Sequence, residues 1–248
     1  MIVLKSDREI ELIREAGKVV AGALEAIKKA VRPGVTTREL DQIAEEYILG
    51  HNALPAFKGY HGFPATICAS VNEEVVHGIP GLRKLKSGDI ISVDIGAIIQ
   101  GYYGDSAVTI PVGDIEPETQ RLLKTTEQSL MVGINKAIVG NRLTDISHAI
   151  QTFVEGQGFS VVRDYVGHGI GSEMHEEPQV PNFGAPGRGL RLKTGLALAI
   201  EPMVNMGTYE VMTKGDDWTV VTRDGGLSAH FEHTIVVTDH GPEILTLL

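Results

Sequence analysis

Two similar apolar segments of the chain each end in a carboxylate. LKSGDIISVD ends at Asp94 and LKTGLALAIE ends at Glu201, so a Leu-Lys-(Ser/Thr)-Gly start and a terminal acid recur at an offset of 107. Both segments have the composition of buried strands. Because a buried ionised carboxylate is costly without a partner, each of these two acids needs an opposite charge nearby.

Further residues with the same chemistry surround both segments. Upstream of each lies the tripeptide HGI, at His77 and at His168, and downstream lies another acid, Asp105 or Glu232. We interpret the chain as a doubled unit in which each half offers one histidine and two carboxylates. A pseudo-twofold fold would bring these groups to one centre.

The segment DIGAIIQGYYGD predicts how the first two acids are placed. Gln100-Gly101 is a plausible two-residue hairpin turn between alternating strands. With this turn, Asp94 and Asp105 lie diagonally on one face, roughly 7 to 8 Å apart. That spacing is too wide for a shared proton and suits carboxylates that reach inward to a metal.

Carboxylates gathered at one point repel each other and lose their hydration. Two divalent cations would neutralise the four acids named above. Oxygen-rich ligands with an imidazole suit Mn, Fe, Co or Zn. Paired metals about 3.5 to 4 Å apart activate water for hydrolysis. A single acid in a strand is usually a surface or ion-pair residue, but the repetition favours a functional site.

The elements that must position these residues follow from helix caps and strand patterns. Ser6 with Glu9 and Thr36 with Glu39 form capping boxes, and Pro117 suits a first helical turn. The order is helix, helix, strands, twice over. We expect helices over about residues 6–30, 36–50, 117–140 and 143–155, and strands around residues 65–71, 89–99, 102–110, 160–166, 196–204 and 229–237.

Composition excludes several classes of protein. The net charge of −10 argues against a general binder of nucleic acid, which needs a basic face. Cys68 is the single cysteine, so an intramolecular disulfide and a cysteine zinc cluster are excluded. The sequence has no apolar run long enough to span a membrane, no signal peptide, and no HExxH, GxSxG or P-loop motif. We expect a soluble cytosolic protein.

A specific resemblance appears at these residues. The ordered set Asp94, Asp105, His168, Glu201 and Glu232 resembles the dinuclear metal site of the type I methionine aminopeptidases. The family motifs are FKGYHGFP, VNEEVVHGIPG, VDIGA, GYYGDSA, GHGIGSEMHEEPQVPN, AIEPM, DDWTVVT and FEHTIVV. The resemblance covers essentially the whole chain.

The fold that the resemblance implies is the α+β pita-bread fold. In it a duplicated helix-helix-strand unit surrounds a central antiparallel sheet with pseudo-twofold symmetry. We expect one catalytic domain over residues 1–248, with halves of about 1–112 and 113–248.

The resemblance also implies ligand roles for two divalent ions. Asp94 would chelate one metal, Asp105 and Glu232 would bridge both, and His168 and Glu201 would complete the shell of the other. A bridging water or hydroxide would attack the first peptide carbonyl, with Glu201 as proton shuttle. The metal would be Co, Mn, Fe or Zn.

Substrate contacts are carried over in the same way. His175 would donate a hydrogen bond to the substrate carbonyl or oxyanion. His77 would contact the backbone after the methionine and assist proton transfer. The apolar methionine pocket would consist of Tyr60, Phe63, Cys68 and Trp218, with Phe57 and Met174 at its edges. Relatives often carry Cys in place of Phe57 and Phe in place of Met174, so the shape of the pocket would differ here.

The remaining histidines are interpreted as structural. His51, His61, His148 and His240 are assigned to the core or surface, and His230 and His233 to positions behind Glu232 or on the surface. A monovalent cation near Asn72 and Ser228 is implied by the family. The expected substrates are nascent chains with an initiator methionine and a small second residue, met at the ribosome. The expected state is a monomer of the minimal bacterial-like type.

Three alternatives stay open. A prolidase or aminopeptidase P shares the fold, but such proteins usually have an added N-terminal domain, whereas the first helix here is predicted to begin near residue 6. A binding protein of this fold would have lost metal ligands. A creatine-type hydrolase would not need all five.

Overall fold

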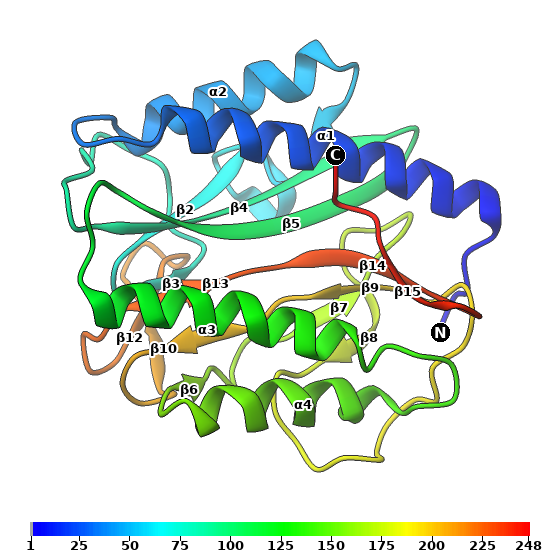
Figure 1. The fold of residues 1–248 in the computed structure, drawn as a ribbon. Coiled ribbons are helices and arrows are strands. Elements are labelled where there is room, and N and C mark those ends of the chain that lie inside the picture. Colours follow the sequence, from blue (N-terminus) through cyan, green and yellow to red (C-terminus); the bar gives the residue numbers. More distant parts are fainter. Residues whose placement is uncertain (1) are drawn as a thin grey trace.

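Two similar halves lie one above the other in the computed structural model, which describes residues 2–248 (Figure 1). In the upper half, α1 (Asp7–Ala30) and α2 (Thr37–Gly50) cover the strands. In the lower half, α3 (Pro117–Ile134) and α4 (Leu143–Gly156) do the same. Among the described residues, no helix is both long and apolar enough to cross a membrane.

The helices begin where the caps predict. The Ser6–Glu9 and Thr36–Glu39 boxes are both formed, and Pro117 occupies the first turn of α3. The predicted end of α3 at residue 140 is wrong, because the helix ends at Ile134. Tight turns follow it, and the N–H of Gly140 (φ 94°) donates to the carbonyl of Leu192 in the second half.

The predicted hairpin is present in the upper half. It joins β4 (Ile90–Ile99) to β5 (Tyr102–Pro111), and Gln100 and Gly101 have φ of 49° and 84°, as a type I′ turn requires. The other edge of β4 pairs with β1 (Leu54–Pro55) and β2 (Ile67–Val71).

The lower half contains a second antiparallel sheet of order β15-β14-β9-β7-β8. A smaller sheet has the order β13-β10-β6. Its strand β10 follows β9 in the sequence, and its strand β13 precedes β14. The bounds are β6 Ser160–Val161, β7 Gly167–Gly169, β8 Glu176–Val180, β9 Ala197–Ile200, β10 Met203–Asn205, β13 Ser228–His230, β14 His233–Thr238 and β15 Gly241–Ile244.

Three predicted strands differ from the observed ones. The strand expected over 160–166 is reduced to its first two residues, β6. The strands expected over 196–204 and 229–237 are each interrupted. Pro202, which has no N–H to donate, follows Glu201 in the first break. At the second break the N–H of Glu232 donates to Ala107 of β5, so the chain turns there toward the other half.

A fourth sheet, which the sequence patterns did not predict, joins segments that are distant in the sequence. Its order is β11 (Val211–Thr213), β12 (Val220–Thr222) and β3 (Glu74–Val76). These strands have three residues each, too few for a strand pattern to emerge from a single sequence. This sheet carries one wall of the site described below.

Backbone hydrogen bonds repeat within one residue of the predicted offset of 107. The N–H of Gly34 donates to Leu85, as the N–H of Gly140 donates to Leu192. The Leu-Lys-(Ser/Thr)-Gly segments therefore have the same structural role in both halves.

The two HGI tripeptides are not part of this repeat, contrary to the prediction. His168 pairs with Ala199 of β9, and the residue of β4 that corresponds to Ala199 is Ser92. Ser92 pairs with Ser70, so the counterpart of His168 is Ser70 and not His77.

The second pair of acids does not match either. Asp105 pairs with Gly96, and the residue corresponding to Gly96 is Met203, which pairs with His230. His230, and not Glu232, is therefore the counterpart of Asp105. The histidines of the two tripeptides, and the acids Asp105 and Glu232, are therefore of the same residue type but do not occupy equivalent positions in the strand pairing of the two halves.

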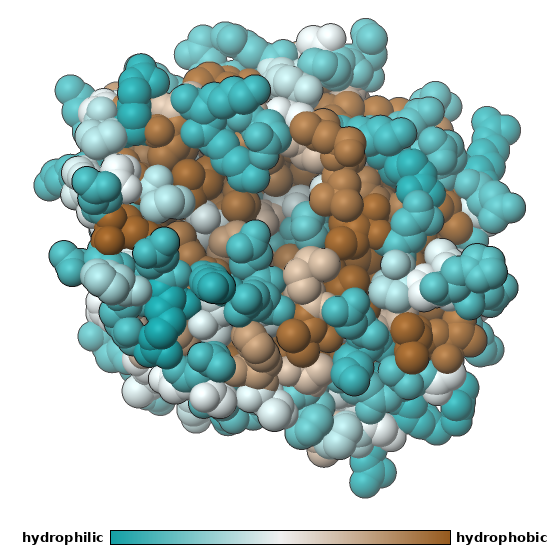
Figure 2. Space-filling model, viewed as in Figure 1, coloured by the Kyte–Doolittle hydropathy of each residue, from teal (hydrophilic) through white to brown (hydrophobic). Residues whose placement is uncertain are grey.

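The outer, helical face carries an apolar seam. Figure 2 shows hydrophobic side chains between α1 and α3, where a groove is lined by both helices, by β5 and by the C-terminal segment. Among the described residues, no predicted ligand or substrate-pocket residue lines this groove. The candidate site lies elsewhere.

Candidate metal centre and substrate pocket

Strand alternation turns the acids of β4 and β5 away from the helices. Ile91, Val93 and Ile95 of β4 pack in the core with residues of α1 and α2. Side chains of a strand alternate between its faces, so Asp94 faces the opposite side. Asp94 pairs with Ala107 and Gly96 with Asp105, which puts both acids on that face as the hairpin predicted.

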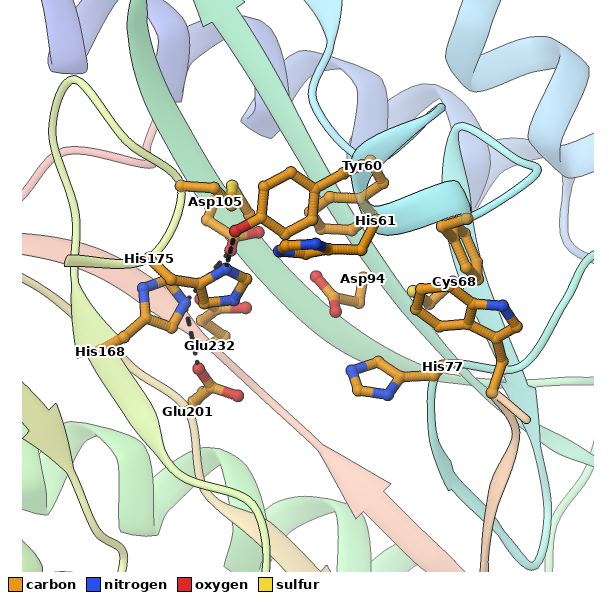
Figure 3. Close-up of a pocket in the computed structure, with 14 residues that line it drawn as sticks. Tyr60, His61, Cys68, His77, Asp94, Asp105, His168, His175, Glu201 and Glu232 are labelled. Carbon is orange, nitrogen blue, oxygen red and sulfur yellow. Dashed lines mark hydrogen bonds and ion pairs between the residues drawn. The ribbon is translucent and has the colours of Figure 1, made fainter. Parts of the chain in front are cut away.

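The five predicted ligands line one cavity (Figure 3). One ligand atom from each of Asp105, His168 and Glu232 lies within 4.8 Å of the others. His168 Nε2 is 3.7 Å from Asp105 Oδ2 and 3.5 Å from Glu201 Oε1. Asp94 and Asp105 lie on the adjacent strands β4 and β5 and line the same cavity. Both halves of the chain thus contribute to one centre.

Burial favours the protonated form of all four acids, and repulsion between carboxylates adds to this effect at Asp105, Glu201 and Glu232. Loss of hydration raises the pKa of Asp94 to about 7. The pKa values of Asp105, Glu201 and Glu232 are raised well above their usual range, first by burial and then by the neighbouring carboxylates. Such a cluster needs positive charge before all its members can ionise.

The unpartnered atoms of the cluster indicate where that charge belongs. Asp94 Oδ1, Asp105 Oδ1 and Glu232 Oε1 are buried, and none has a hydrogen-bond partner among the residues that the structure describes. Buried polar atoms are normally satisfied. Divalent cations accept such oxygen ligands, so the residues fit a metal site.

His168 is oriented as a metal ligand. Its Nδ1 lies 2.9 Å from the carbonyl oxygen of Gly169, which can only accept, so Nδ1 carries the proton. Nε2 then presents its lone pair to Asp105 and Glu201. Burial lowers the pKa of His168 to about 3, so the ring is neutral, as ligation requires.

His175 and His77 flank the carboxylates. The hydroxyl of Tyr60 is 2.8 Å from His175 Nδ1, and the rings of His175 and His168 are 4.3 Å apart. His77 (φ 59°) packs edge-on against Tyr165 and Trp218. Burial lowers the pKa of both histidines, that of His77 to about 4.

The predicted methionine-pocket residues form one apolar cluster beside the acids. They line a cavity of about 250 Å³ that the carboxylates share. Cys68 pairs with Asp94 across β2 and β4, which joins the pocket to the metal centre. The Phe63 and Trp218 rings meet edge to face at 5.1 Å. The cluster includes Phe57, Tyr60, Phe63, Cys68, Met174 and Trp218.

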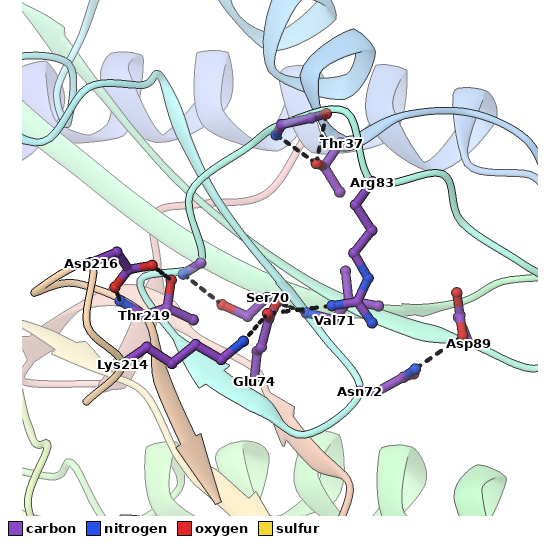
Figure 4. A network of polar contacts seen from close by, with 12 residues as sticks. Thr37, Ser70, Val71, Asn72, Glu74, Arg83, Asp89, Lys214, Asp216 and Thr219 are labelled. Carbon is purple, nitrogen blue, oxygen red and sulfur yellow. Dashed lines mark hydrogen bonds and ion pairs between the residues drawn. The ribbon is translucent and has the colours of Figure 1, made fainter. Parts of the chain in front are cut away.

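Trp218 is held by the loop between β11 and β12. Asp216 accepts hydrogen bonds from the N–H groups of Trp218 and Thr219, at 3.0 and 2.8 Å, and from the Thr219 hydroxyl. At the start of this loop, Lys214 donates to Glu74, whose other oxygen accepts from the N–H of Val71 (Figure 4).

Two histidines refine the prediction. His61 was assigned to the core or surface, but it lines the cavity, with φ of 48° in the turn YHG. A positive φ at a residue other than glycine is uncommon and clusters at functional sites, but φ is invisible in the sequence. His230 is buried behind Glu201, its Nε2 3.7 Å from Glu201 Oε2.

The other assignments are placed as follows. His233 is largely buried and contacts the Thr246 hydroxyl at 2.8 Å, on the helical side. The N–H of Ser228 donates to the carbonyl of Asn72, so these two residues are adjacent. The monovalent cation expected beside them stays a prediction.

Comparison with known proteins agrees with this geometry. Residues 11–239 match the model of metallopeptidase family M24. The methionine aminopeptidase of Clostridium acetobutylicum is 60% identical, and the match spans all of this chain and 99% of that one. The crystal structure of methionine aminopeptidase from Thermotoga maritima has a TM-score of 0.99 and 50% identity, with full coverage of both chains. A prolidase from Pyrococcus furiosus, at 21% identity and a TM-score of 0.80, shares the fold. This chain covers 66% of that prolidase.

Proposed function

The chain belongs to metallopeptidase family M24, and we infer that it removes N-terminal methionine from peptides and proteins by metal-dependent hydrolysis. It is similar to methionine aminopeptidases over its full length. The observation that carries the inference is the cavity in which a buried acid cluster adjoins an apolar pocket.

The metal ligands proposed are Asp94, Asp105, His168, Glu201 and Glu232. Their unpartnered oxygens and the oriented imidazole support this assignment. Two divalent ions, drawn from Mn, Fe, Co and Zn, would balance the four carboxylates. When bound, such a pair polarises the scissile carbonyl and lowers the pKa of water.

The protein's own residues would bind the substrate and handle protons. Tyr60 can donate to His175 Nδ1, which leaves His175 Nε2–H to donate to the substrate carbonyl as negative charge develops. His77 would contact the backbone of the second residue. Glu201 would take a proton from the attacking water and deliver it to the leaving amine.

The pocket would hold the methionine side chain. A thioether is unbranched and polarisable and favours contact with aromatic rings. The ring pair Phe63–Trp218, with Cys68 and Met174, offers such contacts. Phe57 and Tyr60 complete the proposed wall.

Both halves contribute ligands, which supports one catalytic domain over residues 1–248, with halves of about 1–112 and 113–248. The proposed substrates are nascent chains with an initiator methionine and a small second residue, met at the ribosome. We propose that the protein acts in the cytoplasm as a monomer.

The test compares free methionine released from Met-Gly-Met-Met with cleavage of Met-Pro and Gly-Pro peptides by metal-loaded protein. We expect release from Met-Gly-Met-Met and no cleavage of Gly-Pro peptides. Cleavage only before proline, whatever the first residue, would assign the chain to the proline-directed branch that shares its fold. No cleavage of any peptide by folded, metal-loaded protein would overturn the inference.

A further inference from the structure

Lys5 is a buried cation that is far in the sequence from all the proposed metal ligands. Its side chain is 2% exposed, and Nζ lies 2.5 Å from Oε2 of Glu176, which is 13% exposed. Lysine is rarely buried unless it is paired. Burying an ion pair costs hydration energy that the attraction often fails to offset, so net stability is a poor explanation for this pair.

Glu176 lies beside the substrate site. It directly follows His175 and begins β8, where it pairs with Gly169 of β7. Its Oε1 is 3.3 Å from the N–H of Glu173. One carboxylate therefore contacts both its own loop and Lys5. The loop between these contacts carries Met174 and His175.

The surrounding backbone leaves room for Lys5. A Cβ atom at Gly171 would collide with Lys5 Cε and Glu176 Oε1, and one at Gly195 would lie 2.7 Å from the Lys5 carbonyl oxygen. The N–H of Lys5 donates to the carbonyl of Gly195 at 2.7 Å. In Figure 1 the N-terminal segment rises beside this part of the lower half before α1 begins.

The loop is also held from the cavity side. Tyr60 contacts His175 Nδ1, and the N–H of Tyr103 donates to the carbonyl of Gly171. These contacts fix the ring and one end of the loop, whereas Lys5 fixes Glu176 at the other end. Small displacements of a catalytic group cost much rate.

We propose that Lys5 is a positioning residue that acts through Glu176 to hold Met174 and His175 against the substrate. The proposal rests on the proposed function, because His175 and Met174 are assigned there to the carbonyl and the methionine side chain. It gives the N-terminal segment a part in the reaction.

The test is Lys5→Met, which keeps the apolar stem and removes the ammonium. We expect kcat/KM for Met-Gly-Met-Met to fall about tenfold at a temperature well below unfolding. Affinity for Mn²⁺, measured by calorimetry, should change less than about twofold, since no proposed ligand lies on this loop. The matched control is Lys28→Met, which breaks the exposed pair with Glu25 and should leave kcat/KM unchanged.

A second readout does not depend on activity. Hydrogen–deuterium exchange of the peptide covering residues 171–176 should speed up in Lys5→Met, while the β11–β12 hairpin stays as in the unsubstituted protein. The variant Glu176→Gln keeps an oxygen for Lys5 and should lose less activity than Glu176→Leu.

The outcomes distinguish failure of the proposed function from failure of the proposed role of Lys5. If the unsubstituted protein releases no methionine, the proposed function fails, and exchange still tests the contact. A lower unfolding temperature in Lys5→Met, with unchanged kcat, KM and exchange over residues 171–176, would reduce the pair to a stabilising contact and overturn the proposal.

Discussion

The hydroxyl of Thr234 hydrogen-bonds both backbone polar groups of Asp105. It accepts from the Asp105 N–H at 3.1 Å and donates to the Asp105 carbonyl at 2.8 Å. Asp105 lies on β5 and Thr234 on β14, so one side chain joins the two halves at a proposed ligand.

The equivalent contact is also made in the opposite direction, from a threonine of the first half to the backbone of the second half. Thr109 of β5 accepts from the N–H of His230 and donates to its carbonyl, both at 2.8 Å. The pseudo-twofold relationship exchanges Thr109 with Thr234 and Asp105 with His230, as the strand registers indicate. One half therefore presents a carboxylate where the other presents an imidazole.

Thr234→Val should destabilise the protein and weaken metal binding. Valine has the shape of threonine but leaves the buried N–H and carbonyl of Asp105 without partners. We expect a loss of about 2 to 4 kcal/mol in the free energy of unfolding, measured by urea denaturation of the metal-free protein. Affinity for Mn²⁺ should fall about tenfold, because support for a ligand is lost.

Thr238→Val is the control, since the Thr238 hydroxyl donates to the Gly241 carbonyl and accepts from the His240 N–H within its own hairpin, and neither partner is a proposed ligand. If Thr234→Val matched this control in stability and metal affinity, the contact would have no part in building the centre.

Asp216→Ala should weaken substrate binding more than it slows turnover. Asp216 accepts three hydrogen bonds from Trp218 and Thr219, and these bonds lower its pKa. Without them the Trp218 ring loses its fixed position against Phe63. We expect KM for Met-Gly-Met-Met to rise several-fold, with kcat within about twofold.

Asp217→Asn is the matched control, because asparagine tolerates the positive φ of 64° at that position. A fall in kcat with unchanged KM would contradict the assignment of Trp218 to the methionine pocket.

The metal-free protein should lose stability as the pH rises above about 7. The acids of the centre have raised pKa values, so the folded state holds protons that the unfolded state has already released. His77, His168 and His230 have lowered pKa values and act in the opposite direction, but only below the ordinary histidine pKa of about 6.5. Above that pH the loss of stability continues mainly through Asp105, Glu201 and Glu232, because Asp94 releases its proton near pH 7.

Calorimetry in two buffers of different ionisation enthalpy measures the same groups. Mn²⁺ binding at about pH 7.5 should release at least about one proton per chain, and saturating metal should flatten the loss of stability with pH. Metal binding without proton release would show that the acids are already ionised in the metal-free protein.

The hairpin could be predicted because its signal is local, whereas the five proposed ligands were named from the repeated segments and the family resemblance. Gln100-Gly101 sets the register of Asp94 and Asp105, and capping boxes fix the starts of α1 and α2. The pocket residues were assigned through family resemblance, and the structure brings all of them together. Their individual roles stay predictions.

The missed features depend on distant contacts. The β3-β11-β12 sheet is built from three-residue strands far apart in sequence, and the break at Glu232 reflects a hydrogen bond to Ala107. The cavity position of His61 depends on a backbone angle. His77 was wrongly matched with His168 because the HGI tripeptide occurs in both halves, although the two histidines do not occupy equivalent positions in the strand pairing.

The most direct test of the account is methionine release from Met-Gly-Met-Met during titration of the metal-free protein with Mn²⁺, compared with Glu201→Gln. The exposed Glu210→Gln serves as control. The account predicts no release without metal, full activity with two ions per chain, and a loss of at least about a hundredfold in Glu201→Gln alone. Release that persists in chelator, or that survives Glu201→Gln, would contradict it.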